Sequence, residues 1–318
     1  MPIVLFGHTA FEYWAHSSSR GTDFEGSVSR LLSGSIPTIK SVRHLERVLP
    51  YLSKPYHLLV GCPADRRRVG GVRCHVSSSL PQRGSLSQIE DGLYSSTPEL
   101  CFVQMASGSP ILQLVRDGYL LCGRYRVFSA VERGGSSRFD LVERKLLCRQ
   151  ESLERFAVRA SHLEGSARAR RVIPFVLENA ASPAEISMAM RLILPYRLGG
   201  FGLPSPVLNA RIELSSSAKQ IAVKSHHEVD MLWPADKVVV EYDSNLLHLN
   251  SASMTVDAIK RGVLEEMGYK IVTVTADQLR DPELMRRVAL RIGRRLSFRV
   301  RPRGSDFSRL QQDLFMLR

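Results

Sequence analysis

The segment Lys237-Val238-Val239-Val240-Glu241-Tyr242-Asp243 constrains the fold more than any other part of this sequence. Its β-branched first half favours a buried strand, and its second half is acidic. Because side chains alternate along a strand, Val239, Glu241 and Asp243 share one face. The segment therefore predicts a strand that leaves a hydrophobic core and ends in carboxylates.

The segments around this strand show a regular order of elements. Ser182-Pro183-Ala184-Glu185 is a capping box with proline at the first helical position, and it predicts the start of a helix. The predicted helices cover residues 183–195, 253–267 and a last one from 282, and the predicted strands cover 209–214, 227–233, 237–243 and 269–274. The order α-β-β-β-α-β-α predicts an α/β C-terminal domain with a mixed sheet.

The first half of the chain alternates short apolar segments with turn-forming residues, which predicts an α+β domain. Expected strands cover residues 55–61, 72–76 and 119–122, and expected helices cover 41–52 and 97–105. The charged stretch from Arg149 to Arg171 is expected to be partly helical and to connect the two halves. We place the domains at residues 1–165 and 166–318.

Carboxylates are the most informative polar residues of the second half. Asp230 and Glu241 lie on consecutive predicted strands joined by Pro234-Ala235-Asp236, so a hairpin would bring them together at one end of the sheet. Crowded carboxylates repel unless a proton, an arginine or a divalent cation relieves them. Mg²⁺ or Mn²⁺ suits these oxygen ligands and can activate a water against a phosphodiester. A solvated strand end, with Glu185 only capping its helix, is the alternative.

Basic residues exceed acidic ones, with 44 Lys and Arg against 31 Asp and Glu and a net charge of +13. The predicted last helix carries a cluster of arginines that suits phosphate oxygens. Its members are Arg286, Arg287, Arg291, Arg294 and Arg295. Nucleic acid is the expected partner class, and a solvated helix face is the alternative.

Cysteine content and hydropathy bear on compartment. The five cysteines are scattered without a C-x-x-C pair, which favours reduced thiols over a zinc site or disulfides. No apolar stretch approaches the ~20 residues of a membrane span, and the first residues lack the pattern of an export signal. We expect a cytoplasmic protein that does not bind membranes.

The order of these motifs resembles the Vsr-related branch of the restriction-endonuclease-like PD-(D/E)XK superfamily, over roughly residues 174–296. The resemblance implies an α-β-β-β-α-β core. It also implies site roles for Glu185, Asp230, Glu241, Asp243, His248, Asp257 and Arg261, by position in the motifs. Asp230 and Glu241 would bind the metal with the carbonyl of Tyr242 as a possible further ligand. Glu185 and Asp243 would support the cation or the attacking water.

This sequence departs from the family pattern at three positions. Ser244 replaces the usual glycine, Glu228 stands where arginine is common, and Asp243 occupies the superfamily's lysine position, as in this branch. The motif itself therefore fixes no cation beside the scissile phosphate. Positioning of water would need another residue, and the candidates are His226, His227, His248 and Lys237.

The first half is similar to the AbiEi-antitoxin-like region that precedes a nuclease-like domain in multidomain actinobacterial proteins. The residues that carry this similarity are 8–14, 57–61 and 94–106. The similarity implies that this half positions the protein on DNA or on a partner.

Three hypotheses follow. The first is a Mg²⁺- or Mn²⁺-dependent DNA endonuclease, and the second is a DNA-binding regulator or antitoxin-like protein that keeps a nuclease scaffold without cleaving. The third is a scaffold protein whose arginines are paired internally. A protein partner or a homodimer is compatible with each.

Overall fold

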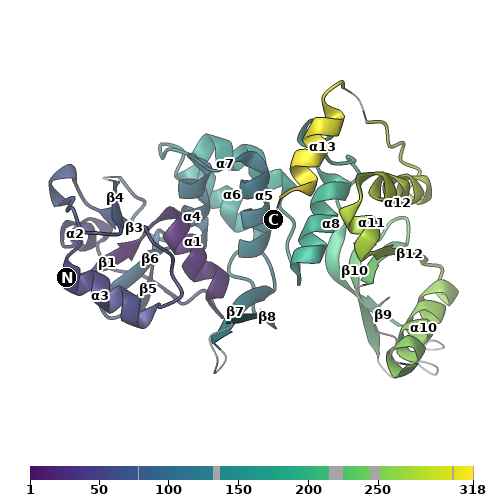
Figure 1. Ribbon diagram of the computed structural model, residues 1–318, viewed down its shortest axis with the longest axis horizontal. Helices are drawn as coiled ribbons and strands as arrows, with labels where there is room; N and C mark the ends of the chain where they lie inside the picture. Colours follow the sequence, from purple (N-terminus) through teal and green to yellow (C-terminus); the bar gives the residue numbers. More distant parts are fainter. Residues whose placement is uncertain (78, 132–136, 215–224, 244–250, 303, 318) are drawn as a thin grey trace. The chain divides into compact units, whose positions relative to one another are not determined.

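The structure is a computed structural model. It describes residues 1–77, 79–131, 137–214, 225–243, 251–302 and 304–317. The chain forms two compact units, Met1–Val176 and Leu177–Arg318 (Figure 1). Each unit has its own sheet and helices, so each is described by itself.

The boundary between the units lies later than the sequence predicts. Helix α7 (Ser166–Val172) packs against α4 (Pro98–Ala106) and α6 (Gln150–Arg159) of the first unit. Gly165 precedes α7 at φ 91°, and a Cβ there would lie 2.2 Å from the carbonyl oxygen of Val103. This close approach ties the start of α7 to α4, so the first unit ends at Val176 rather than at residue 165.

The first unit is built on a six-stranded mixed sheet in the order β2-β5-β6-β1-β3-β4. Its strands are β1 (Ile3–Leu5), β2 (Thr22–Asp23), β3 (Tyr56–Val60), β4 (Val72–Val76), β5 (Leu86–Glu90) and β6 (Leu93–Ser96). Strand β1 runs parallel to β6 and antiparallel to β3, and β3 runs parallel to β4. A separate hairpin pairs β7 (Tyr125–Val131) with β8 (Ser137–Glu143). The further helices are α1 (Gly7–His16), α2 (Val28–Ser33), α3 (Ile39–Val48) and α5 (Ile111–Leu121).

One element of the first unit was predicted wrongly. Residues 119–122 were expected to form a strand, but they are the end of helix α5 and its C-cap. A short apolar run cannot by itself distinguish a strand from a buried helix. Here tertiary packing decides, because a Cβ on Gly118 would lie 2.6 Å from Val176 Cγ2, and Tyr119 is fully buried. The predicted elements at 55–61, 72–76, 41–52 and 97–105 match β3, β4, α3 and α4 to within a few residues.

The second unit contains the predicted order α-β-β-β-α-β-α and two helices, Ala276–Arg280 and Phe307–Phe315, that the sequence analysis did not predict. Its elements are α8 (Pro183–Ile193), β9 (Val207–Glu213), β10 (His226–Trp233), β11 (Val238–Asp243), α10 (Ser251–Glu266), β12 (Lys270–Thr275), α11 (Ala276–Arg280), α12 (Pro282–Arg295) and α13 (Phe307–Phe315). The strands form a mixed sheet in the order β12-β11-β10-β9, in which β11 and β12 are parallel and the other pairs are antiparallel. The mixed α/β character expected for this part is confirmed.

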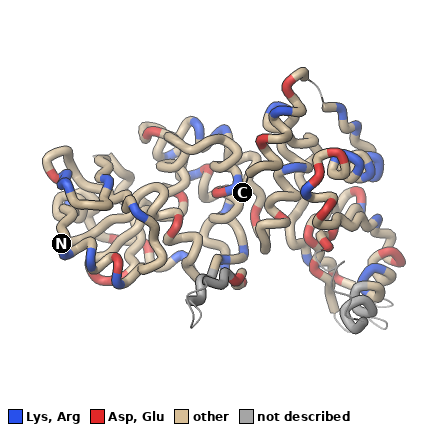
Figure 2. Tube along the Cα trace, in the orientation of Figure 1, with Lys and Arg blue, Asp and Glu red and all other residues tan. Residues whose placement is uncertain are grey.

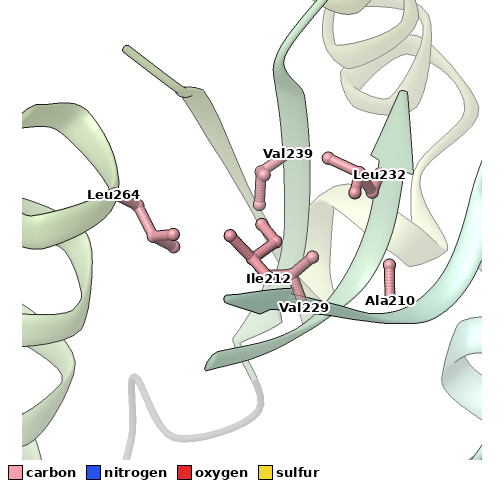
Figure 3. Close-up of a cluster of buried hydrophobic side chains, with 6 residues drawn as sticks. All are labelled: Ala210, Ile212, Val229, Leu232, Val239 and Leu264. Atoms are coloured by element: carbon pink, nitrogen blue, oxygen red, sulfur yellow. The ribbon is translucent and has the colours of Figure 1, made fainter. Parts of the chain in front are cut away.

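The core of the second unit explains the valine run. Val238, Val239 and Val240 are all fully buried, as expected for a strand covered on both faces. Leu264 of α10 joins a cluster of buried side chains from β9, β10 and β11 (Figure 3). This cluster holds α10 close to β11, near the point where the strand becomes acidic.

All five cysteines are free thiols, and Cys122 and Cys148 lie 3.6 Å apart through their sulfur atoms. Among the described residues, no helix combines the length and the apolar character needed to cross a bilayer.

Candidate carboxylate site on the second sheet

A row of polar residues crosses the four-stranded sheet. Met231 pairs with Val240, and this register places Asp230 opposite Glu241. On the other side, Ala210 pairs with Val229 and Leu208 with Met231, which places Asn209 opposite Asp230. Glu241 pairs with Thr273 of β12. The row Asn209, Asp230, Glu241 and Thr273 therefore takes one residue from each strand.

Asp230 is the most perturbed acid of the row. Its Oδ2 accepts a 2.6 Å hydrogen bond from the backbone N–H of Tyr242. Burial, together with smaller effects of the neighbouring Glu241 and Glu185 carboxylates, raises the pKa of Asp230 to about 7. The Tyr242 N–H and Lys260 act in the opposite direction. Asp230 thus holds a proton near neutral pH unless a cation compensates its charge.

Glu185 reaches the row from the N-terminus of α8. The side chain is buried, with Oε1 2.8 Å from Ser182 Oγ and Oε2 2.8 Å from the backbone N–H of Ala181. Asn209 Nδ2 donates to the same Oε2 at 2.5 Å. Glu185 thus contacts the start of α8 through the Ala181 N–H and the Ser182 hydroxyl, rather than through the Ser182 N–H that a capping box uses. The same carboxylate also lies close enough to affect Asp230.

Lys260 supplies a cation that the sequence analysis did not identify. Its Nζ lies 2.8 Å from Glu241 Oε1 and donates to the carbonyl oxygen of Glu228 at 2.7 Å. Lys260 belongs to α10, so it approaches β11 from a different element. One sequence feature could have indicated Lys260, because it directly precedes Arg261 of the predicted motif. The predicted cations were instead three histidines and Lys237.

Asn209 is the second residue that the sequence analysis missed. It has a left-handed backbone with φ 46° inside β9, a conformation that asparagine tolerates better than most residues. Its Nδ2 bridges the carbonyl oxygen of Asn179 and the Glu185 carboxylate. Asparagine is uncommon within a strand, and this was the available signal.

The other predicted site residues lie in different places. Asp243 ends β11 and pairs in register with Thr275, two residues beyond Glu241. Arg261 donates to Thr273 Oγ1 at 2.9 Å, at the β12 end of the row. His248 falls outside the described residues, and for Asp257 only the backbone in α10 is described. Lys237 is occupied elsewhere, because its Nζ donates to the carbonyl oxygen of Met267 at 3.0 Å.

Of the four residues predicted as candidates to position water, the structure describes Lys237, His226 and His227. His226 and His227 lie at the start of β10, where they pair in register with Glu213 and Ile212 of β9. These pairs are several residues along the strand from Asp230. Neither histidine is therefore part of the row, and the cation beside Glu241 is Lys260.

The five arginines of α12 have three kinds of environment. Arg291 and Arg295 donate to the carbonyl oxygens of Thr273 and Ile271, at 3.0 and 2.7 Å, on the edge strand β12. Arg286 and Arg287 lie 3.3 and 3.9 Å from Glu283 on their own helix. Arg294 has no side-chain partner within the described ranges. Figure 2 shows basic residues gathered along α12.

The donor set suits a hard divalent cation held by few protein ligands. Within the described part of the chain, no three or more His, Cys, Asp and Glu side chains form a metal-binding group. Mg²⁺ is commonly held by one or two carboxylates, with water and substrate oxygens completing the shell. Asp230, Glu241 and the carbonyl of Tyr242 can supply such a partial set, and a cation would favour the charged form of Asp230, whose pKa burial raises.

Comparisons with known proteins give two relatives. Both are uncharacterized proteins of Mycobacterium tuberculosis, from strains CDC 1551 / Oshkosh and H37Rv, and each is 28% identical over 162 residues, covering 49% of this chain and 52% of the relative. The chain thus spans about half the length of these curated relatives. No protein-family model matches the chain. No solved structure matches it either.

Proposed function

We propose that the second unit is a restriction-endonuclease-like domain of the Vsr-related type that hydrolyses DNA phosphodiesters with Mg²⁺ or Mn²⁺. The observation that carries the proposal is Asp230 opposite Glu241, with the pKa of Asp230 raised to about 7 by burial and by Glu241 and Glu185. The element order and the parallel pairing of β11 with β12 across α10 support the same assignment.

Asp230 and Glu241 would hold the ion, with the Tyr242 carbonyl as a further oxygen ligand. When bound, the ion supplies a water of lowered pKa and stabilises negative charge on the phosphate. The Tyr242 N–H orients the Asp230 carboxylate, and Lys260 orients Glu241. Asn209 donates a hydrogen bond to Glu185 and orients it. The charge of Glu185 raises the pKa of Asp230, and a bound cation would offset this effect.

The basic side of the site would hold the DNA backbone. Arg261 and Arg291 both contact Thr273, the last residue of the polar row, through its hydroxyl and its carbonyl oxygen. Each guanidinium has five donors, so these contacts leave others for phosphate oxygens. The reaction would be in-line attack of water on phosphorus that breaks the bond to the 3′ oxygen, which takes up a proton and leaves as a 3′-hydroxyl.

Plasmid cleavage tests this proposal. Purified protein should nick supercoiled plasmid with Mg²⁺ or Mn²⁺, and Asp230→Ala and Glu241→Ala should each abolish nicking while DNA binding persists. Glu265→Ala is the matched control, because Glu265 is an exposed acid on the same α10 as Lys260. Nicking that survives in both variants, or equal loss in the Glu265 variant, would contradict the proposal.

A second function is favoured by one specific observation. The Tyr242 N–H and Lys260 already satisfy Asp230 and Glu241 within the protein, so the site can exist without metal. The protein would then be a DNA-binding regulator or antitoxin-like protein on a nuclease scaffold. This function predicts salt-sensitive DNA binding with no nicking under any divalent metal. The AbiEi-like role of the first unit, positioning on DNA or a partner, stays a prediction.

A further inference from the structure

Four aromatic rings gather on the first unit, near the end of β1, the start of β3 and the end of β4. Phe6 and His75 are stacked with centroids 4.1 Å apart and planes within 8° of each other. His57 and His75 are also nearly parallel, with centroids 4.9 Å apart, and His75 Nε2 lies 2.9 Å from His57 Nδ1. His8 meets the edge of His57 at 5.9 Å. We call Phe6, His8, His57 and His75 the ring cluster.

The charged groups around the ring cluster are positive. Burial, together with smaller effects of His57, Arg73, Arg66 and His8, lowers the pKa of His75 to about 4. Burial, His8 and Arg73 likewise lower the pKa of His57. These groups come from α1, β3, β4 and the segment before β4, which are the elements that surround the rings.

No acid within the described residues offsets this charge. Arg66 and Arg73 are exposed and form no ion pair within the described ranges. The acid nearest in sequence to Arg66, Asp65, is engaged by the Cys62 backbone N–H at 3.2 Å and by the Cys62 thiol at 3.1 Å. The cluster therefore combines partly exposed rings with uncompensated positive charge. Such a surface favours an anion that carries a flat aromatic group.

We infer that the ring cluster, with Arg66 and Arg73, binds a nucleotide unit of single-stranded nucleic acid, its phosphate on the arginines and its base on the rings. Bases stack on Phe, His and Arg side chains in proteins that bind single strands. A free nucleotide would present the same chemistry. The inference does not depend on hydrolysis by the second unit, because none of these residues belongs to the carboxylate site.

Binding should strengthen as the pH falls from about 6 to about 4, because the free His75 ring has a pKa of about 4. A bound phosphate favours the protonated form of His57 and His75, so it raises their pKa values and links binding to proton uptake. A phosphodiester carries the same charge at both pH values. A pH effect on oligonucleotide binding that disappears with His75→Gln can therefore be assigned to the rings.

The test uses the full chain in EDTA, so that cleavage does not interfere. Fluorescence anisotropy follows a labelled oligodeoxythymidine of about 12 nucleotides, with inorganic phosphate and thymidine monophosphate as competitors. Arg73→Ala and His75→Gln should each weaken binding roughly tenfold. The matched control is Arg43→Ala, an exposed arginine of the same unit without a partner among the described side chains, and it should change affinity less than about twofold.

An NMR titration of the His75 ring resonances measures the pKa of His75 in the wild-type protein. The His75→Gln protein serves only to assign these resonances, so misfolding of a variant cannot affect the result. Saturating oligonucleotide should raise the pKa of His75. If thymidine monophosphate competes at concentrations close to those of the oligonucleotide, the ligand of the ring cluster is a free nucleotide. An unchanged His75 pKa on saturation, or Arg73→Ala and His75→Gln proteins that bind as tightly as Arg43→Ala, would overturn the inference. Failure of plasmid nicking would leave this result unaffected.

Discussion

At the scale of single residues, Asp230 sets the chemistry of the carboxylate site. Its ordinary pKa is 3.8, and its pKa in the folded protein is about 7 because of burial and of Glu241 and Glu185. A carboxyl whose folded pKa is raised stabilises the fold below its unfolded pKa, and this contribution is lost as the pH rises through about 7. Metal binding requires the ionised form of Asp230, and in the absence of a metal this form destabilises the folded protein.

Replacing Asp230 by Asn should therefore stabilise the protein at alkaline pH. Asn cannot ionise but can still accept the Tyr242 N–H bond. The shift from 3.8 to about 7 corresponds to at most about 4 kcal/mol above pH ~8. Thermal unfolding of wild type and variant should differ most near pH 8 and converge near pH 4. Equal melting temperatures at both pH values would show that Asp230 ionises normally.

Lys260 should set the pH dependence of cleavage. Lys260 lowers the pKa of Asp230, so Lys260→Met should raise that pKa and move the rising limb of the pH profile of nicking to higher pH at subsaturating metal. Lys237→Met is the control, because its Nζ contacts Met267 instead. An unchanged profile in Lys260→Met, measured over the same pH range, would remove Lys260 from the site.

Sequence reasoning located some of these residues and not others, for a physical reason. Asp230 and Glu241 could be paired in advance because the short turn Pro234–Lys237 fixes the register of the hairpin between them. Lys260 comes from a helix and Asn209 from a strand paired through a long connection. Their positions depend on tertiary packing, which local patterns do not encode.

At the scale of elements, α12 protects the free edge of the sheet as well as carrying charge. Arg291 and Arg295 bind carbonyl oxygens of β12 that have no neighbouring strand. The sequence analysis assigned all five arginines of α12 to the nucleic-acid backbone. The structure shows that two of them also have a structural partner, and that Arg286 and Arg287 lie beside Glu283.

Two alanine variants on α12 should separate these roles. Arg295→Ala removes a charged donor from Ile271 and should lower the free energy of unfolding by about 1 to 2 kcal/mol. Arg294→Ala should leave stability unchanged but weaken DNA binding and reduce its salt dependence by about one phosphate contact. Denaturant unfolding and binding at several salt concentrations measure both. Equal effects of the two variants on stability would contradict this division.

Element order was predictable in the second unit and less so in the first. The sequence pattern predicted α8, β9, β10, β11, α10, β12 and α12 in order, with bounds that differ by a few residues, but it did not predict α11 or α13. The strand predicted at residues 119–122 was wrong, because an apolar run in a buried helix resembles a strand in sequence. The first unit extends past the predicted boundary to Val176, because α7 packs against α4.

At the scale of the whole molecule, two units with separate chemistry share one chain. The carboxylate site lies in Leu177–Arg318, and the ring cluster lies in Met1–Val176. Both proposals concern nucleic acid, which agrees with the net charge of +13. The shared substrate class gives a simple reason for a single chain to carry both units, because the first would bind a strand while the second acts on it.

Calorimetric titration with Mg²⁺ tests the central claim, that Asp230 and Glu241 together hold a divalent cation. The titration should be done near pH 8, where Asp230 has lost its proton. The account predicts that the wild-type protein binds Mg²⁺ at this site, that Asp230→Asn and Glu241→Gln each abolish the binding, and that Glu265→Ala preserves it. Wild-type protein that takes up no Mg²⁺, or variants that bind it as tightly as the wild type, would contradict the account.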